Sequence, residues 1–274
     1  MSVIQAIVLG LVQGIAEFLP ISSSGHLVII RDIFNWEDPG LFFDVVLHLG
    51  SLIAILVYFR KEWLRLIKML PDFFRSFSGR AGLPTKEFLL SKIVVGIIPA
   101  TIVGVFLEGV LDKYFRNFFI VAFWLFATGA IFVFTETVAR LHKRLTEITI
   151  LDSFLIGIAQ IFALIPGVSR SGITISAGLL QGIKRSAAAK FSFMMGGPLI
   201  FGAGLFELFK FLKDGQVTES FSFFLTGFLI AVVTSYLAIR FLMRFLKKHS
   251  LFVFAYYLFA LAILLLVWGI VNNV

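Results

Sequence analysis

Glu17, His26 and Arg170 are the residues best suited to chemistry in this chain, because each stands in an apolar segment where a charge is costly. An ionisable side chain at membrane depth costs about 2.5–3.5 kcal/mol, and such groups are functional by default. A carboxylate and an imidazole can take up and return protons, and a planar guanidinium can bind two phosphate oxygens at once. Together the three residue types predict a site that binds phosphate and moves a proton beside it.

These residues lie in two copies of one motif. GLVQGIAEFLPISSSGH at Gly10–His26 aligns without a gap with GIAQIFALIPGVSRSGI at Gly157–Ile173, at a constant offset of 147 residues. Each copy is an apolar run, a break at proline, a serine-rich turn and a second apolar run. Broken hydrophobic segments at matching positions of two halves are the best sequence indication of a functional site in a membrane protein. The scaffold is duplicated, whereas the ionisable groups are divided between the copies.

The serine-rich turns predict two helix N-termini that face one anion. A serine before a helix caps its first amides, and the remaining N–H groups and the positive dipole end favour phosphate. The residues expected to bind the anion are Gln13, Ser22, Ser24, Gly25, Ser169, Ser171, Gly172 and Thr174. The structural alternatives are serines that only cap, a Glu17–His26 pair that only neutralises itself, and an Arg170 that only binds loop carbonyls. All three together are disfavoured, because the predicted topology brings both motifs to one place.

Other polar groups in apolar segments carry less weight. They lie at or near the ends of predicted spans, where snorkelling or supporting roles are expected rather than catalysis. They are Asp44, His48, Lys92 and Glu108.

The composition is that of an integral membrane protein. Hydrophobic residues make up 59% of the chain and charged residues 15%, and the mean hydropathy is +0.99, whereas soluble domains carry about 25% charged residues. Long apolar runs favour helices over an outer-membrane barrel. The absence of cysteine excludes disulfides and thiolate metal sites. The net charge of +8 is assigned to loops at a membrane surface rather than to nucleic-acid binding.

Six stretches approach the ~20 residues that a helix needs to cross a hydrocarbon core of ~30 Å. They are Leu41–Phe59, Phe88–Leu107, Phe118–Phe134, Phe191–Phe209, Phe221–Ile239 and Leu251–Ile270. Within the repeated motifs the arms beyond the turns are too short to cross, so each motif predicts a re-entrant helix pair that enters and leaves by the same face. The expected fold is an all-α polytopic membrane protein with six transmembrane helices plus two re-entrant helix pairs in an inverted-topology repeat.

Loop charges support this topology. Three spans and one re-entrant pair make each half, and because three is odd the second half must be inverted. The loops predicted on one side hold 17 Lys and Arg residues and the opposite loops hold five; the first group is 60–87, 138–152, 184–190 and 240–249. The positive-inside rule places that group in the cytoplasm and both termini outside. The first re-entrant pair then enters from the outer face, the second from the cytoplasmic face, and their tips meet. The expected organisation is a single integral membrane domain, 1–274, with internal repeats at approximately 1–137 and 150–274.

The two motifs also match a known family. EFLPISSSGH at Glu17–His26, preceded by Gln13, and PGVSRSGIT at Pro166–Thr174 closely resemble the signature regions of bacterial undecaprenyl-diphosphate phosphatases, the bacitracin-resistance proteins. The resemblance spans the chain. It implies hydrolysis of undecaprenyl diphosphate to undecaprenyl phosphate and inorganic phosphate, which recycles the lipid carrier for cell-wall synthesis. It also implies a multi-pass protein of the bacterial cell (inner) membrane, with its active site facing the periplasmic or outer side.

Carried over by position, the resemblance implies catalytic roles for Glu17, Ser23, His26 and Arg170. Ser23 is the expected nucleophile, with Glu17 and His26 taking its proton; attack by water is the competing mechanism. Many members have glutamate at the position of Gln13, so a metal held by two carboxylates would here have one, and a divalent cation (Mg or Ca) at Glu17 stays open. The expected partners are a polyprenyl diphosphate and membrane lipids, with no nucleic acid; a homodimer stays open.

Four other functions compete with this interpretation. A secondary transporter or a lipid flippase built on inverted repeats is the alternative, because broken helices are typical of transporters; either would leave the diphosphate intact. Type-2 phosphatidic-acid phosphatases have similar SGH and SR motifs but need a second histidine after the SR segment, and here none follows Arg170 until His249, in a predicted cytoplasmic loop. A purely structural membrane protein has no use for the buried ionisable groups.

Overall fold

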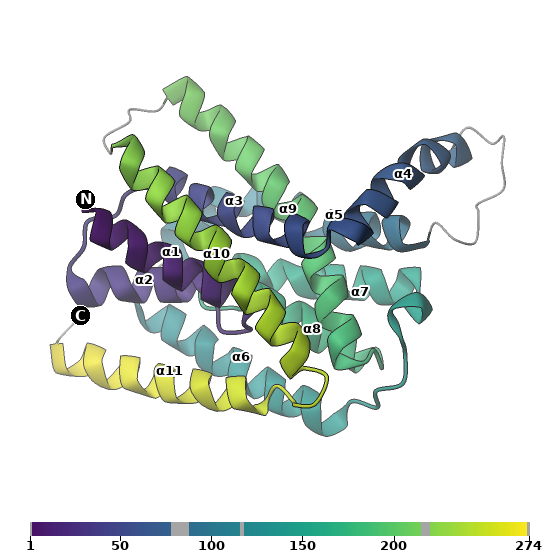
Figure 1. Ribbon diagram of the computed structural model, residues 1–274. Helices are drawn as coiled ribbons and strands as arrows, with labels where there is room; N and C mark the ends of the chain where they lie inside the picture. Colours follow the sequence, from purple (N-terminus) through teal and green to yellow (C-terminus); the bar gives the residue numbers. More distant parts are fainter. Residues whose placement is uncertain (1, 78–87, 116–117, 215–219, 273–274) are drawn as a thin grey trace.

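The computed structural model describes residues 2–77, 88–115, 118–214 and 220–272. These residues form α-helices and two short 3-10 helices, η1 (Leu145–Glu147) and η2 (Phe162–Leu164), and contain no β-strand beyond an isolated bridge between Lys143 and Ile183 (Figure 1). The all-α polytopic fold expected from the sequence is confirmed. Three cations of the loop-charge count, Arg80, Lys86 and Arg116, lie outside the described residues.

Within the described chain, six helices are long and apolar enough to cross a membrane, as predicted. They are α3 (Leu41–Tyr58), α5 (Phe88–Phe115), α6 (Phe118–Val138), α9 (Arg185–Asp214), α10 (Phe221–Phe245) and α11 (Phe252–Asn272). The largest difference from the predicted bounds is at α5, which ends eight residues after Leu107. The helix α10 ends six residues after Ile239, and α9 begins six residues before Phe191. The segment Arg185–Lys190 contains three alanines, which favour helix, but its charges place it outside an apolar run.

Four helices of the repeated motifs are too short to span. The helices α1 (Val3–Phe18), α2 (Ser23–Phe34), α7 (Ile150–Ile161) and α8 (Arg170–Leu180) have 16, 12, 12 and 11 residues. At 1.5 Å per residue none exceeds about 24 Å, less than the ~30 Å core. Each pair is interrupted at its proline, and the pairs approach each other from opposite ends of the bundle (Figure 1).

Glycines let the first helix of each motif pack closely against a long helix. Gly14 of α1 faces the backbone of α10, where an added Cβ would lie 2.8 Å from the amide nitrogen of Ser235. Gly157 of α7 faces α5, where an added Cβ would lie 2.5 Å from the carbonyl oxygen of Gly96. Small residues of this kind allow backbones to approach within a membrane, where van der Waals packing drives helix association.

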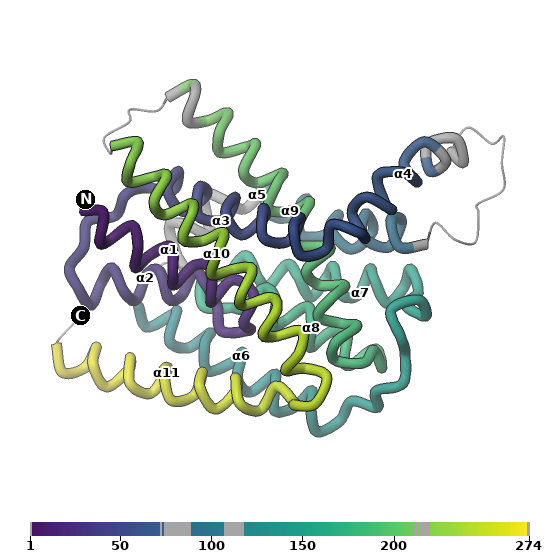
Figure 2. Tube along the Cα trace, in the orientation of Figure 1, coloured from purple at the N-terminus to yellow at the C-terminus, as the bar shows by residue number. Residues whose placement is uncertain are grey.

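The remaining helices surround the motifs. The helix α6 packs along α11, α3 packs on α9 and α10, and α8 packs on α9. The amphipathic helix α4 (Arg60–Phe77) extends away from the bundle (Figure 2). The start of α1 and the end of α11 lie at the same end of the molecule (Figure 1). The short helices are therefore held inside a frame of long ones.

Candidate active site

Glu17 lies at the centre of the predicted site, buried at the end of α1. Its Oε2 accepts hydrogen bonds from Ser23 Oγ at 2.7 Å and from Gln13 Nε2 at 3.1 Å. His48 Nε2 lies 3.5 Å from the same oxygen. Its Oε1 accepts a hydrogen bond from Arg170 Nη2 at 2.7 Å. One carboxylate thus joins side chains of α1, α2, α3 and α8, and so links the two motifs.

The tips of the two helix pairs also lie against each other at their turns. Ser171 Oγ lies 3.4 Å from the carbonyl oxygen of Leu19 and donates to it. A Cβ added to Gly25 would lie 3.4 Å from Gly167 Cα. The structure therefore brings together the two motifs that the inverted repeat was predicted to join.

The serine turns have equivalent caps in both motifs. Ser22 Oγ accepts a hydrogen bond from the amide of Gly25 at 3.3 Å, and Ser169 Oγ accepts one from the amide of Gly172 at 3.1 Å. The first amides of a helix have no carbonyl one turn earlier to bond, so both turns present N–H donors. The turns differ in strain: Ser22 has φ +71°, a left-handed conformation unusual for serine, whereas Ser169 has φ −74°. Such outliers cluster at functional sites.

Arg170 offers an unused donor inside the protein. Its Nη1 is buried and has no hydrogen-bond partner among the described residues. Gly196 of α9 lies directly against the guanidinium, and a Cβ there would overlap Nη1. Because buried polar groups are normally paired, the free N–H is a ready partner for a ligand oxygen. Thr174, expected at the anion, instead donates to the carbonyl oxygen of Arg170 at 2.7 Å and bonds Ser192 Oγ at 2.6 Å.

His26 has different partners from those expected. Its Nδ1 lies 2.8 Å from the carbonyl oxygen of Ser22 and its Nε2 lies 2.7 Å from the hydroxyl of Tyr257. A carbonyl only accepts, so Nδ1 carries the hydrogen and Nε2 of the neutral ring accepts from Tyr257. No hydrogen bond or ion pair joins His26 to Glu17 in the described part of the chain; the imidazole at the carboxylate is that of His48. The sequence had predicted a supporting role for His48 rather than a contact with the catalytic carboxylate.

The sequence did not indicate Tyr257, since it stands in an apolar span like any lipid-facing tyrosine.

The remaining polar residues that the sequence analysis named lie in different surroundings. The carboxylate of Asp44 binds the guanidinium of Arg31, which ties the end of α2 to the start of α3. Lys92 is buried in α5, and the side chain of Glu108 lies outside the described residues. Ser24 is half-buried at its turn.

The donor set does not fit a divalent cation held by the protein. Glu17 is the single carboxylate of the site, and its two oxygens bond to Arg170, Ser23 and Gln13. A resident Mg²⁺ or Ca²⁺ prefers several oxygen ligands, and an adjacent guanidinium repels it. Among the described residues no three His, Asp or Glu side chains gather at one point.

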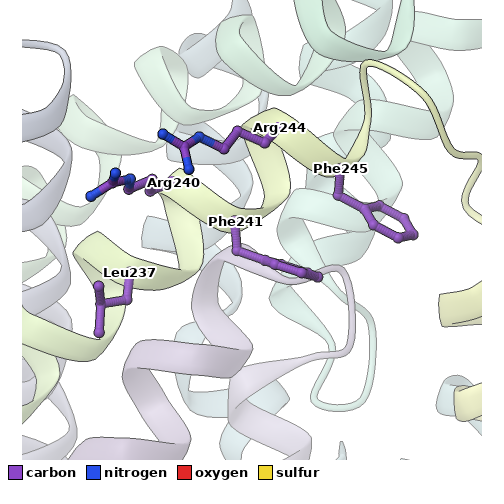
Figure 3. Close-up of a pocket in the computed structure, with 5 residues that line it drawn as sticks. All are labelled: Leu237, Arg240, Phe241, Arg244 and Phe245. Carbon is purple, nitrogen blue, oxygen red and sulfur yellow. The ribbon is translucent and has the colours of Figure 1, made fainter.

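A surface hollow of about 420 Å³ lies on the C-terminal part of α10 (Figure 3). Leu237, Arg240, Phe241, Arg244 and Phe245 line it. None of these residues belongs to either motif. The motif residues are packed between helix tips, so the candidate site is defined by its polar contacts and not by a wide opening.

The chain is similar to members of one protein family over nearly its whole length. The family profile described as "Bacitracin resistance protein BacA" matches residues 6–264. A protein of Caldicellulosiruptor bescii named undecaprenyl-diphosphatase is 41% identical over 275 residues, covering 100% of both chains. Proteins of the same name from Rubrobacter xylanophilus and Moorella thermoacetica are 42% and 43% identical. They cover 96% and 97% of this chain and 97% of each relative. The chain belongs to the BacA family of bacitracin-resistance proteins.

Proposed function

We propose that this protein hydrolyses undecaprenyl diphosphate to undecaprenyl phosphate and inorganic phosphate. The relatives are named for this diphosphatase activity. The observation that carries the proposal is the double contact of Glu17, which accepts a hydrogen bond from the Ser23 hydroxyl on one oxygen and from Arg170 on the other. A nucleophile, a base and a phosphate-binding cation are thus within one cluster. The comparisons give no support to a transporter or a flippase.

Arg170 is the group that binds the terminal phosphate. Its free Nη1 donates to a phosphate oxygen, and the first amides of α2 and α8 add donors at two positive helix ends. In phosphoryl transfer, catalysis is mainly positioning and stabilisation of charge on the transferred group. Glu17 holds the guanidinium in place before the substrate arrives.

Ser23 is the nucleophile in this account. Its Oγ attacks the terminal phosphorus, the bond from phosphorus to the bridging oxygen breaks, and undecaprenyl phosphate leaves with the electron pair. The Ser23 proton passes to Glu17 Oε2, 2.7 Å away. Water then attacks the phosphoserine and releases inorganic phosphate. Direct attack by water, with Glu17 as base, is the competing route.

His26 stands where the rest of the lipid diphosphate would pass. Its Nε2 faces Tyr257 of α11, and the residue lies about one turn after Ser23 on α2. We assign it to the leaving phosphate, which the ring can stabilise by donation from Nε2 when it carries a second proton and a ligand replaces Tyr257. The prenyl tail lies in the bilayer, against exposed aromatic side chains of the long helices.

We also propose an orientation. The loops with the greater positive charge face the cytoplasm of a bacterial inner membrane, so α1 and α2 enter from the periplasmic side and the diphosphate is reached from there. Both motifs come from one chain, so the site needs no second copy; a homodimer is not required for the reaction. Mg²⁺ or Ca²⁺, if required, would accompany the diphosphate, because Glu17 is occupied by its donors.

The test is phosphate release by the purified protein from undecaprenyl diphosphate in detergent, with and without a chelator. The expected products are equal amounts of inorganic phosphate and undecaprenyl phosphate. Transport or binding of the lipid without release of phosphate would contradict the proposed function.

A further inference from the structure

His48 connects the buried carboxylate to the outside of the site. It lies on α3, one turn after Asp44, and its Nε2 is 3.5 Å from Glu17 Oε2. The Glu17 side chain is 5% exposed, whereas that of His48 is 31% exposed. The imidazole therefore touches both the carboxylate and the surface.

The hydrogen-bond partner of the ring fixes its tautomer. His48 Nδ1 lies 2.7 Å from the carbonyl oxygen of Asp44, and because a carbonyl only accepts, Nδ1 carries the hydrogen. In the neutral ring, Nε2 then turns a lone pair toward Glu17 Oε2. Two acceptors do not bond, and 3.5 Å is longer than a normal hydrogen bond. A proton placed between His48 Nε2 and Glu17 Oε2 would let the two groups form a hydrogen bond.

Ser23 can supply that proton. Its hydroxyl donates to Oε2, the same oxygen that faces His48 Nε2. We propose that His48 receives, through Glu17, the proton that Ser23 loses when it attacks the terminal phosphorus. This inference rests on the proposed function. His26 cannot take that place in the observed arrangement, since its two nitrogens bond to Ser22 and Tyr257.

The reaction balances with this path. In the first step the bond from Ser23 Oγ to phosphorus forms, the bond to the bridging oxygen breaks, and the proton moves from Oγ to Oε2 and then to Nε2. In the second step water adds to phosphorus, the bond to Oγ breaks, and a proton from water restores the Ser23 hydroxyl through Glu17. Hydrolysis to two dianionic products releases one proton, which leaves from the partly exposed imidazole.

The charged groups around His48 come from several packed helices. Glu17 faces the ring from α1, and its other oxygen is already paired with Arg170 of α8. Asp44 of the same helix is paired with Arg31 of α2. On the packed helices α9 and α10 the charged side chains lie toward the ends: Glu207 and Lys210 bond to each other, and Arg240 and Arg244 line the surface hollow.

Two variants separate proton transfer from simple hydrogen bonding. His48→Gln places an amide N–H near the position of Nε2 but cannot take up a proton. His48→Ala leaves space for added imidazole. In purified full-length protein we expect kcat for phosphate release to fall about 10²-fold or more in both variants, with KM little changed. Added imidazole should restore the alanine variant and not the glutamine variant.

The matched control is His249→Ala, in the exposed loop beyond α10, which should keep wild-type kcat with or without imidazole. A glutamine variant with near wild-type kcat, or a folded alanine variant that imidazole does not restore, overturns the proposal; thermal unfolding in detergent verifies the fold. If the wild type itself releases no phosphate, the proposed function fails. If the wild type releases phosphate and the His48 variants have the same kcat, this inference fails and the proposed function stands.

Discussion

Arg170 binds Glu17 through Nη2 and leaves Nη1 without a partner among the described residues. The planar shape of the guanidinium, as well as its charge, therefore contributes to binding of the phosphate. Arg170→Lys keeps the charge but loses the fork that can bind a carboxylate and a phosphate together. We expect kcat/KM for undecaprenyl diphosphate to fall about 10²–10³-fold, as when one donor to a developing charge is removed. Steady-state phosphate release measures this, and a lysine variant with wild-type efficiency would argue against a forked contact.

Ser23 is predicted to carry the phosphoryl group. Ser23→Ala should reduce turnover to near background, because no other hydroxyl donates to Glu17 in the described structure. Acid quenching of the wild type with substrate labelled in its terminal phosphate should trap phosphoserine at position 23. Ser250→Ala, in the loop before α11, serves as the control. Substantial activity in Ser23→Ala would instead favour direct attack by water.

The sequence predicts some of these contacts and not others. Glu17 and Arg170 could be paired from sequence because an inverted repeat forces the two broken segments together. His48 could not, because its approach to Glu17 depends on how α3 is rotated against α1. Nor could the contact of the Thr174 hydroxyl with Ser192 Oγ be predicted, because it depends on how α8 packs on α9.

At the scale of the helices, glycine contacts hold the short helices against the long ones. Gly157→Ala should lower the stability of the fold by about 1–3 kcal/mol, the usual cost of overpacking, because the three atoms nearest the new Cβ are backbone of Gly96 and cannot rotate away. Thermal unfolding in detergent measures the loss.

Gly202→Ala in α9 is the matched control, since an added Cβ there meets nothing within 4 Å. It should leave stability unchanged or raise it by up to about 1 kcal/mol through helix propensity. Equal unfolding temperatures for the two variants would contradict the close α5–α7 contact.

The lengths of the elements follow directly from hydropathy. A stretch such as Leu41–Phe59 must be about twenty apolar residues to cross, so α3 ends within one residue of its prediction. The start of α9 could not be found in this way, because Arg185 and Lys190 reach out of the apolar core to Glu136 and Glu62. Ion pairs with other helices decide that boundary.

At the scale of the whole molecule, the proposed orientation can be measured with single cysteines, because the chain has none. Glu37→Cys, exposed between α2 and α3, should react with a membrane-impermeant maleimide in intact cells. Lys248→Cys, exposed after α10, should react only after the membrane is opened. The wild type should not label in either case. The reverse pattern would place the diphosphate site on the cytoplasmic side.

The duplicated motif, with its offset of 147 residues, indicates the arrangement of the molecule, since an odd number of spans in each half inverts the second. What it does not indicate is the contribution of helices outside the motifs. Tyr257 of α11 reaches His26, and Gly196 of α9 makes room for Arg170. Such contacts arise from tertiary packing and leave no local pattern.

The most direct measurement is the initial rate of phosphate release from undecaprenyl diphosphate by purified wild type, Glu17→Gln and Arg170→Ala, each verified as folded. Each variant removes one side of the contact that joins the two motifs. If both motifs act on one diphosphate, the wild type turns over and both variants fall by about 10³-fold or more. Near wild-type release by either folded variant would contradict a shared site.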